Sequence, residues 1–330
     1  MVAGTVAVMG GPAAWRGPDM ARRTDWKIEL TDGQQSELLA ALHQVAGRSL
    51  RDVTRADFVL PTLGAVFASV QRDLLDGRGF ALVRGVPLDG LTPDDIELLY
   101  WGIGLHVGHP IHQRTPDDLL VYVRDQGVDP GSPLVRGYQT AARLDYHCDS
   151  SDVVALLCVR PAASGGVSTI VSTVAVHDEL VRRDPASAAL LHEQWWHDRK
   201  SGDDMSSFFR CSVFGERNGR LFGHYGRAYM ETASRHPDIP GLSPEQVAAL
   251  DALDELTNSP DFVLNMDFRP GDIQFLNNYT VMHARTEYVD HPEPERKREL
   301  IRLWLVMDGD LGLPDDFAAA GIVPREVAFR

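Results

Sequence analysis

The chain has 330 residues, of which 44% are hydrophobic and 24% charged, and its formal net charge is −15. This composition is typical of a globular protein, and the length suits one large β-domain with helical insertions. A strongly acidic chain is not expected to bind nucleic acid, because phosphate contacts need a basic surface. No run reaches the roughly 18 apolar residues of a membrane span, so no membrane partner is expected.

The three cysteines, Cys148, Cys158 and Cys211, are an odd number and match no zinc-binding spacing. They predict reduced thiols in a cytoplasmic protein. Residues 1–9 are apolar but lack a basic start, which makes a poor signal peptide. The sequence does not specify an oligomeric state, so a homo-oligomer is left open.

Residues 1–30 show little periodicity, and we expect an extended lead-in that packs on the body. Apolar spacing, capping residues and Gly or Pro boundaries then predict the elements of the first half. These are helices over 34–45 and 63–75, a strand over 79–85, a helix that begins at Thr92, a strand over 119–123 and a loop over 125–138.

The second half predicts more strands than helices. Asn218-Gly219 favours a hairpin turn, and Ser243 begins a helix with a capping box. The predicted strands cover 153–159, 168–174, 206–214, 220–224, 262–268, 272–276, 280–283 and 298–307. The predicted helices cover 176–183, 185–192 and 243–256. The region 227–240 is expected to be irregular.

This order predicts a mainly β fold with helical insertions. We expect a double-stranded β-helix, the cupin-like jelly roll, buttressed by helices outside one sheet. No linker divides the chain, so residues 1–330 are expected to form one domain. Its probable lids are the segments at about 108–142 and 200–240.

The candidate metal ligands are His147 and Asp149, with His283 far downstream. Two histidines and one carboxylate are the donors of a facial triad that holds Fe(II) with open positions. Residues two apart on a strand point to the same face, so His147 and Asp149 can share one metal. Cys148, between them, then points away and is expected to pack. His283 must come from a strand folded back beside the first pair.

A pair of basic residues, Arg298 and Arg302, lies in the apolar run that ends the predicted sheet. Their spacing of four residues puts both guanidinium groups on one face of a strand. Because buried arginines need carboxylate or phosphate partners, this pair predicts an anionic ligand. The alternative for Arg298 is a surface salt bridge to a nearby glutamate.

Together these motifs resemble the taurine/2,4-D dioxygenase family of Fe(II)- and 2-oxoglutarate-dependent oxygenases. The similarity covers roughly 79–308 and includes Gly165-Gly166-Val167-Ser168-Thr169 and the Pro-Gly-Asp and Asn-Asn block ahead of His283. It implies Fe(II) on His147, Asp149 and His283, with 2-oxoglutarate and O2 in the three open positions.

The resemblance also implies how the co-substrate is held. Arg298 matches the arginine that binds the distal carboxylate of 2-oxoglutarate. Ser168 matches a hydroxyl that contacts the same molecule, and a register shift of one residue would exchange it with Thr169. Arg302 is expected to help in catalysis by holding either the C1 end of 2-oxoglutarate or an acidic group of the substrate.

The predicted activity is hydroxylation of an unactivated C–H bond in a small molecule, with release of succinate and CO2. Desaturation, cyclisation and epimerisation remain open, because the ligands do not separate them. Halogenation is disfavoured by the presence of Asp149. A non-catalytic cupin-like sensor and a zinc hydrolase are the alternatives from other classes, and the hydrolase lacks a candidate general base.

Several other polar residues are given lesser roles. The histidines 106, 109 and 112 are expected to be solvated or to line a channel, and Trp195, Trp196 and His197 to be core and rim residues. Arg227 and Tyr229 are candidate substrate contacts. Asn277 and Asn278 are expected to form the turn before the strand of His283.

Overall fold

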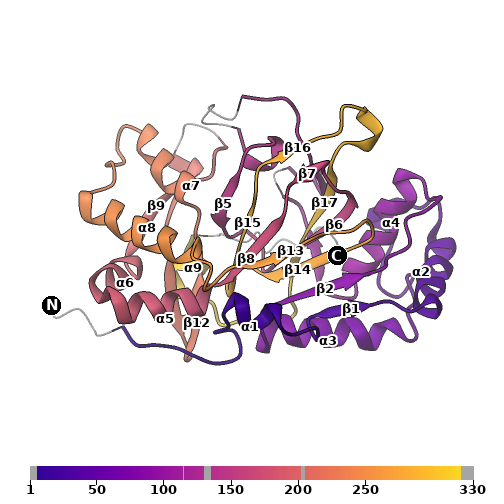
Figure 1. Cartoon of the computed structure of the whole chain (residues 1–330), viewed down its shortest axis with the longest axis horizontal. Helices are drawn as coiled ribbons and strands as arrows, with labels where there is room; N and C mark the ends of the chain where they lie inside the picture. Colours follow the sequence, from indigo (N-terminus) through magenta and orange to yellow (C-terminus); the bar gives the residue numbers. More distant parts are fainter. Residues whose placement is uncertain (1–5, 114, 130–134, 202–204, 321–330) are drawn as a thin grey trace.

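The structure is a computed structural model that describes residues 6–113, 115–129, 135–201 and 205–320. Two β-sheets pack face to face, with helices outside both (Figure 1). The larger sheet runs β1 (Lys27–Glu29), β2 (Phe80–Arg84), β14 (Ile273–Asn277), β6 (Val153–Arg160), β17 (Glu299–Val306) and β3 (His109–Ile111), and β4 (Leu120–Val123) also pairs with β17. The smaller sheet runs β13 (Leu264–Met266), β8 (Ser168–Ser172), β15 (Val281–Arg285) and β5 (Leu144–His147).

Alternation along β17 shows why two apolar layers form on the larger sheet. Ile301 and Leu303 face the helices on its outer side, whereas Leu300 and Trp304 face the space between the two sheets. Successive strand residues point to opposite faces, so a continuous apolar run fills both layers. The predicted double-stranded β-helix is therefore confirmed.

Helices cover the outer faces of both sheets, not of one alone (Figure 1). Thr31, Thr92 and Ser243 close capping boxes, which satisfy the amide groups that begin three of these helices. The larger sheet is covered by α2 (Asp32–Val45), α3 (Leu63–Asp76) and α4 (Pro93–Gly104), and the smaller by α5 (Thr173–Arg183), α6 (Pro185–Leu191) and α8 (Pro244–Thr257). The short helices are α1 (Gly17–Ala21), α7 (Arg227–Glu231) and α9 (Asp315–Ala319), with 3₁₀ turns η1 (Leu50–Asp52), η2 (Gly137–Gln139), η3 (Met205–Ser207), η4 (Thr232–Arg235) and η5 (Pro294–Arg296).

The predicted hairpin at Asn218-Gly219 is present, but its first strand is shorter than expected. Both turn residues have positive φ, 55° and 70°, as a type I′ turn requires. Only β11 (Phe214–Arg217) pairs with β12 (Arg220–Gly223), while β10 (Phe208–Ser212) pairs with β9 (Gln194–Asp198). The prediction of one strand over 206–214 was wrong because the chain changes partner at Val213. The region 227–240, expected to be irregular, contains α7 and η4.

The described residues of the lead-in and of the two expected lid segments contain more regular structure than their composition indicates. Trp15 and Trp26 are buried between the sheets, and β1 extends the larger sheet in parallel with β2. The first lid segment contributes β3 and β4 to that sheet. Residues 114, 130–134 and 202–204 of the two segments lie outside the described residues.

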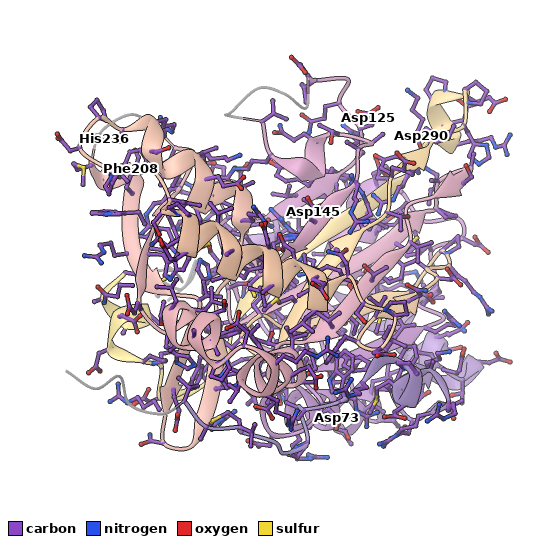
Figure 2. The ribbon with its side chains drawn as sticks, turned by 60° about the vertical axis from the view of Figure 1, so that its left-hand side comes forward. Asp73, Asp125, Asp145, Phe208, His236 and Asp290 are labelled. Atoms are coloured by element: carbon purple, nitrogen blue, oxygen red, sulfur yellow. The ribbon has the colours of Figure 1, made fainter. Side chains whose placement is uncertain are left out.

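The two ends of the sandwich differ in what they carry. Figure 2 places Asp125 and Asp290 toward one end of the molecule and Asp73, at the end of α3, toward the other. Phe208 and His236, from the second expected lid segment, pack against each other with ring centres 5.2 Å apart. The last strand pair, β7 (Ser164–Gly165) with β16 (Tyr288–Val289), completes the fold.

Candidate active site

The two predicted histidine ligands face each other across neighbouring strands of the smaller sheet. β15 runs antiparallel to β5, and the register pairs His283 directly with His147. Their ring centres are 4.1 Å apart. Asp149 follows in the turn after β5, and one donor atom from each of the three residues lies within 4.8 Å of the others.

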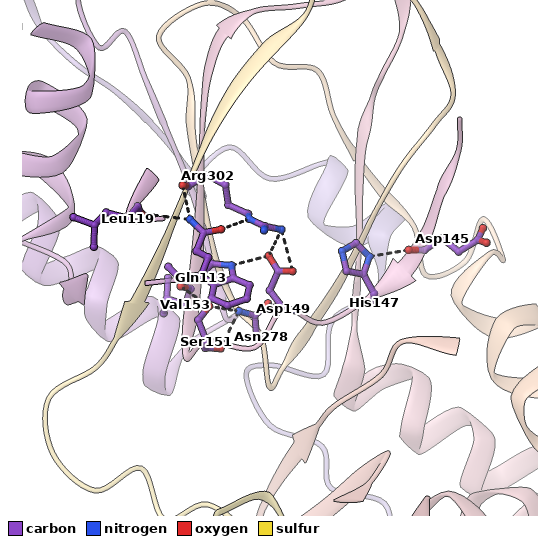
Figure 3. A network of polar contacts seen from close by, with 10 residues as sticks. Gln113, Leu119, Asp145, His147, Asp149, Ser151, Val153, Asn278 and Arg302 are labelled. Carbon is purple, nitrogen blue, oxygen red and sulfur yellow. Dashed lines mark hydrogen bonds and ion pairs between the residues drawn. The ribbon is translucent and has the colours of Figure 1, made fainter. Parts of the chain in front are cut away.

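Backbone contacts hold this turn and orient one imidazole (Figure 3). Nδ1 of His147 donates to the carbonyl oxygen of Asp145 at 2.8 Å, which leaves Nε2 free to bind a metal. The amide of Asp149 donates to Oδ1 of Asn278 at 3.0 Å, and Nδ2 of Asn278 donates to the carbonyl of Ser151. Asn278 therefore braces the turn of Asp149, a role that turn composition did not indicate.

The Asp149 carboxylate is bound on one side by the last long strand. Nε1 of Trp304 donates to it at 3.0 Å, and Nη1 of Arg302 lies 3.2 and 3.3 Å from its two oxygens. Burial alone would raise the pKa of Asp149, but Arg302, the two histidines and the Trp304 hydrogen bond hold it at about 2. The carboxylate is therefore ionised.

The two histidines are held neutral. Burial is the largest cause that lowers the pKa of His147, and burial with the neighbouring His147 lowers the pKa of His283 to about 3. Nδ1 of His283 is buried and has no hydrogen-bond partner among the described residues. Neutral imidazoles beside an ionised carboxylate are the protonation states that divalent metal binding needs, so these residues fit an iron ion.

Gln113 is a polar residue of the site that sequence reasoning missed. Its Oε1 accepts from Nε of Arg302 at 2.7 Å, and its Nε2 donates to the carbonyl of Arg302 at 3.0 Å. This double contact fixes the guanidinium beside Asp149 (Figure 3). Gln113 lies in a loop after β3 without periodic pattern, so only the folded chain brings it to Arg302.

Two further buried arginine side chains lie beside the ring of Tyr288. Arg298 and Arg285 are 3% and 6% exposed, and their guanidinium carbons lie 4.9 and 4.8 Å from the centre of the Tyr288 ring. Burial lowers the pKa of both arginines, to about 10 for Arg285. In the described part of the chain, no carboxylate lies within 4 Å of either side-chain cation. Two desolvated cations without a carboxylate partner favour the binding of an anion.

Comparison with known proteins decides the family. The model of the taurine catabolism dioxygenase TauD, TfdA family matches residues 46–304. This chain belongs to the TauD/TfdA family. It is a non-haem oxygenase that uses Fe(II), 2-oxoglutarate and O2 to oxidise a small molecule, as the motifs predicted.

Individual relatives agree with this assignment. FR-33289 synthase from Streptomyces rubellomurinus is 28% identical over 312 residues, 92% of this chain and 92% of that protein. The fold is similar to that of an asparagine oxygenase solved with Fe(II), 3-hydroxyasparagine and succinate, with a TM-score of 0.64, 17% identity and coverage of 85% and 93%. The fold is also similar to that of the non-haem iron oxygenase OrfP, solved with Fe and alpha-ketoglutaric acid. The TM-score is 0.63 and the identity 17%, and the match covers 86% of this chain and 94% of that chain.

The strand register of the oxygenase separates the two candidate hydroxyl residues. Ser168 pairs with Arg285, and Thr169 pairs with Ala284. Cross-strand partners share a face, so Ser168 lies on the face of Arg285 and His283, and Thr169 on the opposite face. Oγ of Ser168 is 3.3 Å from Oε1 of Gln274, between the two sheets.

Other predicted residues lie outside this constellation. Nε2 of His106 is 2.7 Å from the carbonyl of Phe58, and His109 pairs with Asp308 at the surface. Arg227 forms ion pairs with acidic residues of α7 and α8. Tyr229 is close enough to the site for the charges of Asp149 and Arg302 to affect its pKa, which burial raises. Cys148 is buried in the core under the smaller sheet, as expected for packing. No described helix has both the length and the apolarity to cross a membrane.

Proposed function

We propose that His147, Asp149 and His283 bind the catalytic iron and that the enzyme hydroxylates a C–H bond of its substrate. The observation that carries this proposal is the pairing of His283 with His147 beside an ionised Asp149. When bound, iron supplies with O2 and 2-oxoglutarate the oxidising chemistry, and one oxygen atom goes to the substrate and one to succinate as CO2 leaves. The chain's own residues position these groups and exclude water.

The metal assignment is tested by single substitutions. His147→Ala or His283→Ala leaves two protein ligands, and we expect loss of stoichiometric iron and of succinate release. His109→Ala is the matched control, because this exposed histidine pairs with Asp308 away from the triad. Iron content is measured after anaerobic reconstitution. Full iron occupancy in either triad variant would contradict the assignment.

We propose that Arg298 binds the distal carboxylate of 2-oxoglutarate, with Arg285 adding a second positive charge and Ser168 a hydroxyl. The support is the burial of both guanidinium groups and the register that puts Ser168 beside Arg285. A bidentate guanidinium–carboxylate contact is shorter and stronger than a neutral hydrogen bond. Thr169 faces away and is the natural control for Ser168.

The co-substrate pocket is tested by anaerobic titration of the Fe(II) protein with 2-oxoglutarate. A hydrogen bond to a charged group contributes roughly 1.5–3 kcal/mol, so Arg298→Ala should weaken binding by about ten- to a hundredfold. Arg298→Lys should recover only part, because an ammonium lacks the planar fork. Unchanged 2-oxoglutarate affinity in Arg298→Ala, with a loss in Arg302→Ala, requires the two roles to be exchanged.

We propose that the substrate carries an acidic group and enters over Arg302, Tyr138 and Tyr229. The guanidinium carbon of Arg302 lies 5.0 Å from the centre of the Tyr138 ring, and Nζ of Lys200 lies 5.1 Å from that of Tyr229. Nη2 of Arg136 donates to the carbonyl of Arg199, and no carboxylate among the described residues lies within 4 Å of Arg136 or Lys200. Of these three cations only Arg302 has a carboxylate partner among the described residues, Asp149, and the remaining positive charge favours an anion.

Oxygen consumption with acidic compounds and their neutral amides or esters tests this substrate class. We expect turnover of acidic compounds alone and at least about a tenfold loss in Arg136→Ala, since a charged contact is removed. Equal turnover of the neutral analogues contradicts the proposal. Labelled O2 then separates hydroxylation, which incorporates the label into the product, from desaturation, cyclisation or epimerisation.

We also propose a cytoplasmic location. Its support is chemical: Cys148, Cys158 and Cys211 are all free and buried. Free thiols persist in reducing compartments. Fractionation of the producing cells, with thiol labelling of the unfolded protein, tests this location.

A further inference from the structure

A second group of side chains with suitable donor atoms for a metal lies beside the iron site and has no part in the proposed chemistry. His197 is on β9, Cys211 on β10, and His224 directly follows β12. We propose that these three residues bind a thiophilic divalent cation such as Zn(II). Two imidazoles and one thiol are a different donor set from the carboxylate-containing triad.

The strands bring these three side chains together. Phe209 pairs with His197 across the antiparallel β9–β10 pair, and Cys211, two residues further, shares the face of Phe209. The amide of His224 donates to the carbonyl of Val213 at 2.9 Å, just after β10. One donor atom of each residue lies within 4.8 Å of the others, and the two imidazole centres are 5.3 Å apart.

One buried donor in this group lacks a partner. His197 is 1% exposed, and its Nε2 has no hydrogen-bond partner in the described part of the chain. An unsatisfied buried polar atom costs free energy, and native proteins leave few of them. Cys211 is fully buried and His224 is 8% exposed. A cation bound by all three would give this nitrogen a partner.

The charges around the group are compatible with a cation and a thiolate. Burial lowers the pKa of His224 to about 4, so its imidazole is neutral and available as a ligand. Burial raises the pKa of the Cys211 thiol, and Asp316 and Arg199 act on it in opposite directions. A bound divalent ion reverses this preference, because a coordinated thiol is deprotonated. The negative charges of the thiolate and Asp316 then offset the positive charge of the ion, beside the positive charge of Arg199.

The donor set selects the type of ion. Thiolate with imidazole favours zinc or other borderline-soft ions, whereas carboxylate with imidazole suits Fe(II). Three protein ligands leave one tetrahedral position for water or a small ligand. The carbonyl of Tyr225, next to His224, accepts the amide of Cys148, and Gly226 bridges to His147. Metal binding would therefore fix the β9–β10 pair to the backbone that flanks the iron ligands.

The test is performed in full-length His283→Ala, in which the iron triad lacks one ligand. Co(II) is titrated anaerobically as the spectroscopic probe for Zn(II), and thiolate-to-cobalt charge-transfer absorption is recorded. We expect one equivalent of Co(II) with this absorption and its displacement by Zn(II). The absorption should disappear in His283→Ala/Cys211→Ser and persist in His283→Ala/Cys158→Ser, which removes another buried thiol.

His283→Ala/His224→Gln is a second variant, which tests the site independently in case His283→Ala/Cys211→Ser does not fold. It keeps Cys211, and we expect at least about a tenfold weaker Co(II) affinity with circular dichroism unchanged. Absence of thiolate charge transfer in His283→Ala, or its survival in Cys211→Ser, overturns the proposal. The readout depends on Cys211 alone, so it stays separate from any failure of the iron assignment.

Discussion

At the scale of single residues, the site depends on how one carboxylate is held. Asp149 is bound by Arg302 and Trp304, and Arg302 is in turn bound twice by Gln113. Such outer contacts orient a metal ligand and tune its basicity. Arg302 therefore acts on the iron site through Asp149 in the absence of substrate.

Replacement of Gln113 tests this arrangement. Gln113→Leu removes the acceptor of Arg302 Nε, so the guanidinium loses a hydrogen bond in a buried place. We expect kcat/KM for the substrate to fall by about tenfold or more, since a hydrogen bond to a charged group contributes roughly 1.5–3 kcal/mol. Iron content and 2-oxoglutarate affinity should not change.

Gln113→Glu is the matched variant: it keeps an acceptor for Arg302 Nε but loses the donor to the Arg302 carbonyl, so it should restore only part of the activity. Equal kcat/KM in Gln113→Leu and the wild type would mean that Asp149 alone orients Arg302.

At the scale of elements, turns and caps decide where the strands and helices begin. Gly271 precedes β14 with a φ of +81°, and a Cβ there would lie 2.2 Å from the carbonyl oxygen of Val86. Its amide also donates to the carbonyl of Cys158 on β6. The Pro-Gly-Asp block noted in the sequence is therefore a close contact between two strands and a loop.

Gly271→Ala should consequently destabilise the protein. A left-handed backbone and a clash with backbone atoms together should lower the free energy of unfolding by more than about 1 kcal/mol. Gly90→Ala is the control, because Gly90 also has a positive φ, +78°, but no atom within 4 Å of the added Cβ. Urea unfolding measures both variants, and equal losses would assign the effect to φ alone.

The cap of α4 gives a second prediction at this scale. Oγ1 of Thr92 accepts from the amide of Asp95, and the Asp95 carboxylate accepts from the amide of Thr92. Thr92→Ala should lower the free energy of unfolding by about 1 kcal/mol. Ser49→Ala should have little effect, because Ser49 precedes η1 without a capping bond. A similar loss in both would show that the Thr92 side chain does not stabilise the helix.

At the scale of the whole molecule, stability depends on layers of helix and sheet that bury polar groups. His177 and His192 lie between α5, α6 and the Phe214 ring, and their Nε2 atoms are 3.0 Å apart. Burial, then the neighbouring His177, lowers the pKa of His192 to about 4. Asp178, which contacts Nδ1 of His177, faces the same pair.

This pair predicts a pH dependence of stability. An unfolded histidine has a pKa near 6.5, so between about pH 6.5 and 4 the unfolded chain binds more protons than the folded one. The free energy of unfolding should therefore fall as the pH drops through this range, by at most about 1.4 kcal/mol per pH unit from His192. His192→Asn should reduce the slope, and the exposed His43→Asn should not. Parallel slopes in wild type and His192→Asn would contradict the assignment.

The sequence alone determined the fold class, the family and the identities of the candidate ligands. These features are local: the continuous apolar runs of β6 and β17, the capping residues of α2, α4 and α8, and the short motifs around His147 and His283 each lie within a few residues. Local patterns of this kind reflect backbone geometry, which neighbouring residues dictate.

Only the tertiary structure decided which side chains meet. Gln113 reaches Arg302, Arg285 joins Arg298 at Tyr288, and Ser168 rather than Thr169 faces His283, because strands distant in sequence pair in one register. A shift of one residue would turn Ser168 away from the face of His283, and no local pattern specifies the register. The same pairing brings His197 and Cys211 to His224, although the sequence marks His197 only as part of an aromatic run.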